Sequence, residues 1–280
     1  MRQNSVLTLT TFQTQTAASS MNVAYRVLDP SGPDKVPKGL CALAVMTKAP
    51  RAGQVKTRLT PPLTPEEAAA LNICFLRDTT AAISSTALNG GARGIAVYTP
   101  RGDESAYTGI LPAEFELVPQ RGEAFGERIV FAMEDLFRLG FESVCLIDSD
   151  SPTVPQRAFT EAATRLAQAD DPVVLGPSED GGYYLIGMKR LHRALFEDIA
   201  WSTDRVLEQT IERALDMKLA VHLLSTWYDV DDRETLHRLC QEFFVSNRTR
   251  FEGYPAPATR GYLEELLRRE GRDRVWPHDS

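Results

Sequence analysis

The sequence has no long apolar run and no excess of basic charge, and each absence excludes a class of protein. No stretch approaches the roughly 20 apolar residues that a membrane-spanning helix needs. The formal net charge is −7, so the chain lacks the basic surface with which proteins bind phosphate backbones. We therefore expect no membrane span and no nucleic-acid partner.

Closely spaced cysteines and metal-type histidine motifs are also missing. The four cysteines are far apart and form no CxxC pair, which argues against a disulfide framework or a zinc site. Free thiols of this kind are typical of a reducing compartment, so we expect a cytoplasmic protein. The four histidines show no metal spacing, and a GxSxG motif is absent, so a hydrolase triad is not supported.

The chain divides into an extension, a body and a tail. Its first 28 residues contain no acidic residue and no apolar run long enough for a secretory signal. We interpret residues 1–38 as an N-terminal extension, with a disordered segment, a hairpin added to the domain edge and a start at Met21 as alternatives. Residues 39–245 form the predicted domain, and residues 246–280 a helical tail packed on it.

Strands and helices alternate along the body. The continuous apolar run at residues 40–46 is typical of a strand covered on both faces. Further strands are predicted at residues 94–99, 115–118, 143–148, 172–176, 182–188 and 221–224. Helices are predicted at residues 64–88, 125–139, 155–169, 203–216, 232–243 and 261–269. The first of them should begin with a capping box formed by Thr64 and Glu67. This alternation predicts an α/β domain with a mainly parallel sheet flanked by helices.

An acidic triplet directly follows one buried strand. Residues 144–147 are apolar, and Asp148, Ser149 and Asp150 come next, before a Ser-Pro turn. Open α/β sheets bind ligands at the carboxyl ends of their strands, and paired carboxylates suit Mg²⁺ or Mn²⁺. The alternative is that Asp150 or Ser151 only caps the next helix, which needs one side chain and leaves the second carboxylate unexplained.

A basic loop follows the first strand. It contains Lys48, Arg51, Lys56 and Arg58 within eleven residues, separated by small residues. A loop of this composition at a sheet edge can surround a diphosphate or triphosphate. It is not a P-loop, because Val55 stands where a glycine should precede the lysine. The alternative interpretation is a solvated surface loop.

Three other loops carry weaker signals. Gln120 and Gly122 precede a helix and could contact a base, although a plain turn has the same pattern. Glu179 and Asp180 lie before two glycines that join two strands, where a carboxylate could act as a general base or the segment could be only a tight turn. Asp229 could be a late metal ligand, whereas Asp231 with Glu234 is close to a helix-capping arrangement.

Six segments in fixed order resemble a known family. They are KAPRAGQVKTRL, QRGEAFGER, LIDSDSPTVP, LGPSEDGGYYLIGM, IAWSTDRVLEQT and YDVDDRETL. Over residues 39–239 they are similar to the radical-SAM/selenodomain-associated glycosyltransferases, a group also linked to arsenosugar biosynthesis. The resemblance implies the Rossmann-like GT-A fold of nucleotide-diphospho-sugar transferases, which MobA-like nucleotidyltransferases share.

The resemblance also implies roles for individual residues. Asp148 and Asp150 would correspond to the metal-binding DxD, with Asp150 the safer ligand because many related proteins have Gly-Asp or Gly-Ser-Asp at this place. The expected metal ligands are Asp148, Asp150 and Asp229. The expected nucleotide-binding residues are Lys48, Arg51, Lys56, Arg58, Gln120, Gly122 and Arg128. The expected catalytic residues are Asp180, Glu179 and Lys56.

The leading hypothesis is a glycosyltransferase that depends on Mg²⁺ or Mn²⁺. It would move a sugar from a nucleotide-diphospho-sugar donor to a small-molecule acceptor. The second hypothesis is a nucleotidyltransferase similar to phospholactate guanylyltransferase, which would use a nucleoside triphosphate. The third is a nucleotide-binding regulatory protein without turnover, because this fold alone does not fix the chemistry.

Overall fold

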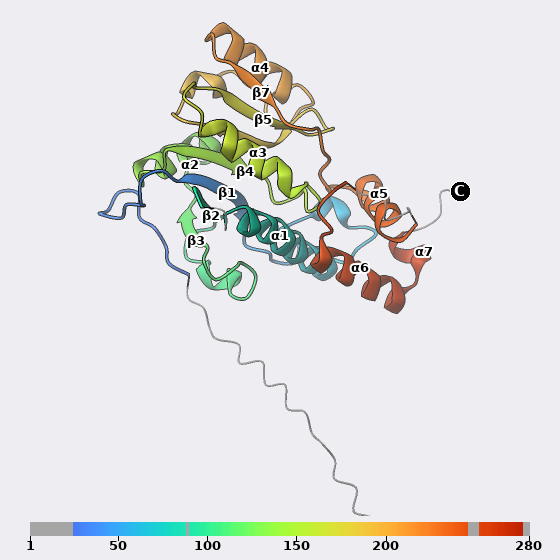
Figure 1. Ribbon diagram of the computed structural model, residues 1–280. Coiled ribbons are helices and arrows are strands. Elements are labelled where there is room, and N and C mark those ends of the chain that lie inside the picture. Colours follow the sequence, from blue (N-terminus) through green and yellow to red (C-terminus); the bar gives the residue numbers. More distant parts are fainter. Residues whose placement is uncertain (1–24, 88–89, 246–251, 277–280) are drawn as a thin grey trace, which may run out of the picture.

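The computed structural model describes residues 25–87, 90–245 and 252–276, and its centre is a seven-stranded sheet with the strand order β3-β2-β1-β4-β6-β5-β7 (Figure 1). The strands are β1 (Cys41–Lys48), β2 (Ala92–Thr99), β3 (Glu116–Pro119), β4 (Ser143–Ile147), β5 (Val173–Pro177), β6 (Tyr183–Met188) and β7 (Val221–Leu223). Only β6 runs antiparallel to its neighbours in this sheet. The predicted α/β, Rossmann-like fold with a mainly parallel sheet is confirmed.

Helices cover both faces of the sheet. Helices α1 (Pro65–Ala87) and α3 (Gln156–Leu166) pack on one face, and α2 (Phe125–Arg138) and α4 (Val206–Asp216) pack on the other. Strands β1 and β4 are buried almost throughout because both of their faces are covered. This explains why their sequences are continuous apolar runs without an alternating pattern.

A third apolar cluster joins the C-terminal helices to α1. Helices α5 (Arg233–Phe244), α6 (Pro257–Glu270) and α7 (Arg272–Val275) contribute buried side chains to it, together with the first half of α1. Figure 1 shows α6 beside α1 at one end of the molecule. Helix α6 begins four residues before the predicted start, and α7 was not predicted.

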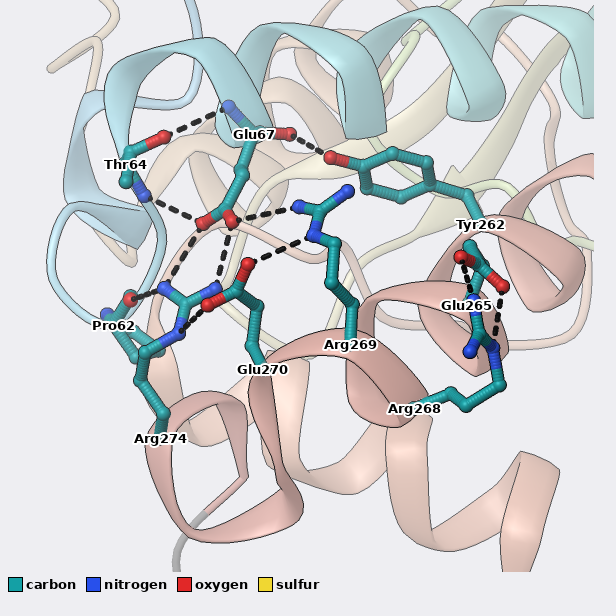
Figure 2. Close-up of polar contacts among 9 residues, drawn as sticks. All are labelled: Pro62, Thr64, Glu67, Tyr262, Glu265, Arg268, Arg269, Glu270 and Arg274. Carbon is teal, nitrogen blue, oxygen red and sulfur yellow. Dashed lines mark hydrogen bonds and ion pairs between the residues drawn. The ribbon is translucent and has the colours of Figure 1, made fainter.

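Polar contacts fix α6 and α7 against the start of α1 (Figure 2). Near the start of α1, the Glu67 carboxylate accepts hydrogen bonds from Arg274 at 2.7 and 3.0 Å, from Arg269 at 3.3 Å and from the Thr64 N–H at 2.9 Å. The last contact confirms the capping box expected at this helix start. Further along α1, the buried Asp78 carboxylate accepts the N–H groups of residues 258 and 259, at the start of α6.

The described part of the N-terminal extension lies along β3, the strand at one edge of the sheet. Leu28 donates its N–H to Leu117 in β3 at 2.8 Å, and the Leu28 side chain is buried. The rest of the extension, residues 1–24, lies outside the described residues. In the described chain, no helix is both long enough and apolar enough to cross a membrane.

Candidate functional site

Four loops meet at one edge of the sheet because the strands before them run in the same direction. They follow β1, β4, β5 and β7. The loops are also bonded to one another: Val230 donates its N–H to the Asp150 carbonyl at 2.9 Å, and Glu179 donates to the Trp227 carbonyl at 2.9 Å. These contacts create a continuous surface from segments that are far apart in the sequence.

Two neighbouring pockets open on this edge. The first has a volume of about 250 Å³ and is formed mainly by the basic loop. It is lined by Lys48, Gln54, Val55, Lys56, Thr57, Arg58, Asn72, Ser149, Asp150 and Asp231. The second has a volume of about 380 Å³ and is acidic and aromatic. It is lined by Arg58, Phe125, Asp148, Ser178, Asp180, Gly182, Tyr183, Trp201, Ser202, Thr203, Asp204, Val206, Asp229 and Asp231. Arg58 and Asp231 border both pockets.

Lys56 is buried between the acidic loops. Its Nζ lies 2.8 Å from Asp150 Oδ1, 2.8 Å from Asp231 Oδ1 and 2.8 Å from the Val230 carbonyl oxygen, and only 3% of its side chain is exposed. Burial by itself lowers the pKa of Lys56, but Asp150 and Asp231 outweigh that effect and raise it. The residue adopts a left-handed backbone conformation with φ 49°, which is uncommon for a lysine. Lys56 therefore carries a permanent positive charge that orients Asp150.

Arg58 is placed differently from Lys56. Its side chain is 77% exposed and lies 3.9 Å from Asp231, so it is free to reach a bound ligand. Because Arg58 borders both pockets, it is the cation best placed to contact a phosphate at the junction between them.

Asp148 and Asp150 lie on the two sides of this junction. Asp148 lines the second pocket and accepts a hydrogen bond from the Ser151 hydroxyl at 2.8 Å, whereas Asp150 lines the first pocket. Burial, together with the nearby Asp150 and Asp229, raises the pKa of Asp148 well above its ordinary value. Helix α3 begins only at Gln156, so neither Asp150 nor Ser151 is its cap.

The two acids of the β5–β6 turn have different environments. Asp180 lines the second pocket, and its Oδ1 accepts the N–H of Gly182 at 2.8 Å. Glu179 instead forms an ion pair with Arg238 at 2.5 Å. Asp229 accepts a hydrogen bond from the Ser178 hydroxyl at 3.1 Å, and burial with the neighbouring Asp180 and Asp231 raises its pKa to about 6.

The carboxylates fit a divalent cation in their chemistry. In the chain segments that the structure describes, no three His, Cys, Asp or Glu side chains converge as a complete ligand set. However, Asp148 and Asp229 are desolvated and close enough to other carboxylates for repulsion to raise their pKa values. Mg²⁺ is commonly bound by one or two carboxylates, with substrate phosphates and water as its other ligands. Asp148 and Asp150 suit that arrangement.

Several predicted nucleotide-binding residues do not reach either pocket. Arg51 forms an ion pair with Asp103 at 2.6 Å. Gln120 donates its amide to the carbonyl oxygens of residues 47 and 97, at 3.2 and 2.7 Å, and so ties β1 to β2. Gly122 and Arg128 line neither pocket, although the left-handed φ of 97° at Gly122 agrees with a glycine-dependent turn.

The expected cap of α5 was placed one residue too early. Asp232 is the N-cap and accepts the Thr235 N–H at 2.9 Å, while Asp231 binds Lys56. The sequence alone assigned no role to Phe125, Trp201 or Asp204. These residues line the second pocket because α2, the β5–β6 turn and the segment before α4 converge there, a tertiary arrangement that local patterns do not encode.

Comparisons with known proteins agree with this fold. The model of the DUF2064 family, described as an uncharacterized protein conserved in bacteria, matches residues 82–203. A protein from Desulfovibrio desulfuricans G20, provisionally assigned as a nucleotide-diphospho-sugar transferase, is 28% identical. The superposition has a TM-score of 0.70 and covers 84% of this chain and 99% of that one. The chain thus has the fold of a nucleotide-diphospho-sugar transferase. No curated protein gives a significant sequence match.

Two other solved structures are more distant. A 4-diphosphocytidyl-2C-methyl-D-erythritol synthase from Anaerococcus prevotii DSM 20548 is 13% identical with a TM-score of 0.45, covering 80% of this chain and 96% of that one. A cytidylyltransferase from Leptospira borgpetersenii serovar Hardjo-bovis (strain JB197) is 10% identical with a TM-score of 0.45, covering 86% of this chain and 98% of that one.

Proposed function

We propose that this protein is a metal-dependent glycosyltransferase that moves a sugar from a nucleotide-diphospho-sugar donor to a small-molecule acceptor. The observation that carries the proposal is the junction of the two pockets, where the Asp148–Asp150 pair, Arg58 and Asp231 meet. A diphosphate in the basic first pocket would direct the attached sugar toward the second. The similarity to the Desulfovibrio protein supports a nucleotide-sugar donor.

In this proposal the aspartates bind the metal, and the cations of the first pocket bind the donor phosphates. Asp150, oriented by Lys56, and Asp148 would hold Mg²⁺ or Mn²⁺ together with donor phosphates and water, and Asp229 would lie nearby in the second pocket. The metal, when bound, would offset the negative charge that develops on the leaving nucleoside diphosphate. Arg58 and Lys48 would add hydrogen bonds and positive charge at the same phosphates.

Asp180 is the base that the geometry favours. It borders the acceptor side of the junction, and among the described residues only its Oδ1 accepts a hydrogen bond, from Gly182. A carboxylate at this place could take the proton of an acceptor hydroxyl as the new glycosidic bond forms. Glu179 is held by Arg238 and is the weaker candidate.

Nucleotidyl transfer is the second candidate, and the basic loop favours it. Lys48, Lys56 and Arg58 all line the first pocket, which suits the greater charge of a triphosphate. In that case the chain would release pyrophosphate from a nucleoside triphosphate. Membership of the arsenosugar-type family and a cytoplasmic location also remain predictions from the sequence.

A thermal-shift panel tests the proposal directly. Nucleotide sugars and nucleoside triphosphates are added with and without Mn²⁺, because a ligand that binds the native state raises the Tm. We expect a nucleotide sugar to raise the Tm only with Mn²⁺, and Asp150→Asn to remove this shift. Asp216→Asn, an exposed change at the end of α4, is the matched control.

The products then separate the two chemistries. Release of nucleoside diphosphate from the best-binding sugar donor supports glycosyl transfer, whereas pyrophosphate from a triphosphate supports nucleotidyl transfer. If nucleotides bind equally well without the metal and in Asp150→Asn, the metal-dependent proposal is wrong.

A further inference from the structure

An aromatic pair forms part of the second pocket, and no step proposed so far uses it. The rings of Phe125 and Trp201 meet edge to face, with their centroids 5.4 Å apart at an interplanar angle of 73°. Phe125, the first residue of α2, is 53% exposed. Both residues line the pocket, so their faces are available to a ligand there.

The Trp201 ring is held in place rather than loose. A Cβ atom on Gly126 would lie 2.4 Å from the indole nitrogen, so the ring rests directly on the first turn of α2. The segment that carries Trp201 is fixed by Gln209, which accepts the Ala200 N–H at 2.8 Å, and by Thr203, which donates to the Ala200 carbonyl at 2.7 Å. A ring fixed in this way loses little entropy when a ligand binds to it.

The same pocket is rich in acidic side chains. Five aspartates line it, against Arg58 as the single lysine or arginine among its lining residues. Lys56 neutralises part of the charge on Asp231, and a metal would offset Asp148 and Asp229. Asp180 and Asp204 remain, and within the described residues neither of them forms an ion pair.

We propose that the second pocket binds an acceptor bearing a positively charged group, such as a protonated or quaternary amine. The group would lie against the Trp201 and Phe125 rings, with Asp204 and Asp180 supplying the opposite charge. Aromatic faces attract cations through their quadrupole, and carboxylates strengthen the attraction. A neutral ligand can donate hydrogen bonds to these carboxylates but cannot offset their charge, so the unpaired acids favour a cation. That the bound cation is the acceptor of a transfer rests on the proposed function, whereas the existence of the cation site does not.

The test compares two probes of the same shape and different charge. Choline carries a quaternary ammonium group, and 3,3-dimethylbutan-1-ol replaces its nitrogen with carbon. Binding of each to the full chain is measured by isothermal titration calorimetry, without nucleotide or metal. We expect choline to bind about tenfold more tightly than the alcohol, the size of a partly desolvated cation–π contact with a nearby carboxylate.

Three variants locate the site, and a fourth serves as the control. Trp201→Leu should remove the preference for choline, and Asp204→Asn should weaken choline without affecting the alcohol. Gly126→Ala keeps both rings but displaces the indole, so it should also reduce the preference if Trp201→Leu does not fold. Asp216→Asn removes an exposed acid outside the pocket and should change nothing.

The outcomes separate this inference from the proposed function. Equal binding of the two probes, or a preference for choline that survives Trp201→Leu and Asp204→Asn, overturns the cation site. If choline selectivity is found but no nucleotide binds with Mn²⁺, the cation site stands and the transferase proposal fails. If a nucleotide binds with Mn²⁺ but choline is not preferred, the transferase proposal stands and the cation site fails.

Discussion

Lys56 joins the basic loop after β1 to the acidic loops after β4 and β7, so we expect it to contribute both to stability and to the site. Lys56→Met keeps a long, unbranched side chain but removes the ammonium that contacts Asp150, Asp231 and the Val230 carbonyl. The two carboxylates are 36% and 38% exposed and can regain water, so the cost is smaller than for a fully buried pair. We expect the free energy of unfolding to fall by about 1–3 kcal/mol.

Urea unfolding followed by circular dichroism measures this change. Lys48→Met is the matched control, because Lys48 is an exposed cation at the end of β1, and surface changes usually stay within about 0.5 kcal/mol. An equal loss in the two variants would mean that the buried contacts of Lys56 add no stability.

The neighbouring acids Glu179 and Asp180 allow a paired comparison of activity. Asp180→Asn removes the carboxylate that borders the acceptor side, and general-base catalysis contributes about 10²–10⁴-fold to rates. We expect kcat to fall by that factor while the nucleotide affinity stays unchanged. Glu179→Gln breaks only the ion pair with Arg238 and should leave kcat within about threefold, because exposed ion pairs contribute little. Equal losses of kcat in the two variants would contradict the assignment.

At the scale of elements, the start of α1 depends on a charge network with α6 and α7. Glu67 is 10% exposed on its side chain, and burial alone would raise its pKa. The Arg274 guanidinium, the Thr64 N–H and Arg269 outweigh burial, so the pKa of Glu67 lies below its usual value of 4.5. A lowered folded-state pKa means that the ionised carboxylate stabilises the folded chain above the unfolded-state pKa.

Glu67→Gln tests this network through its pH dependence. At neutral pH the variant should unfold more easily by about 1–3 kcal/mol, since hydrogen bonds to a charged group are lost. The difference from the wild type should shrink as the pH falls from the unfolded-state pKa of about 4.5 through the lower pKa of the folded chain, where the wild-type carboxylate becomes protonated. Chemical unfolding at several pH values measures it, with the exposed Glu66→Gln as control. A difference independent of pH would exclude the charge as its cause.

The elements themselves were largely readable from the sequence, whereas the site was only partly so. Continuous apolar runs predicted β1 and β4, and the Thr64–Glu67 capping box predicted the start of α1, because these signals are local. The sequence also placed the acidic triplet and the basic loop at the ends of strands. It did not predict that Lys56 would be buried against Asp231, or that Trp201 would rest on α2. Those contacts join residues about 75 to 175 positions apart, and no local pattern determines them.

At the scale of the whole molecule, the C-terminal helices belong to the same folding unit as the sheet. Leu263 of α6 is fully buried in a cluster that includes Phe75 of α1, and α1 also packs on the sheet. Leu263→Ala should therefore destabilise the whole domain by about 2–5 kcal/mol, the usual cost of such a cavity. At about 2–4 °C per kcal/mol, the Tm should fall by several degrees in one cooperative transition.

Two probes distinguish one unit from two in the Leu263→Ala variant. Far-ultraviolet circular dichroism reports all helices and strands, whereas tryptophan fluorescence includes Trp276, which is buried beside α6. In a single unit the two melting curves coincide, because α6 packs on α1 and α1 in turn covers one face of the sheet. If fluorescence changes at a lower temperature than circular dichroism, α6 and α7 unfold separately. The edge of the sheet that carries Asp150 would then not depend on them.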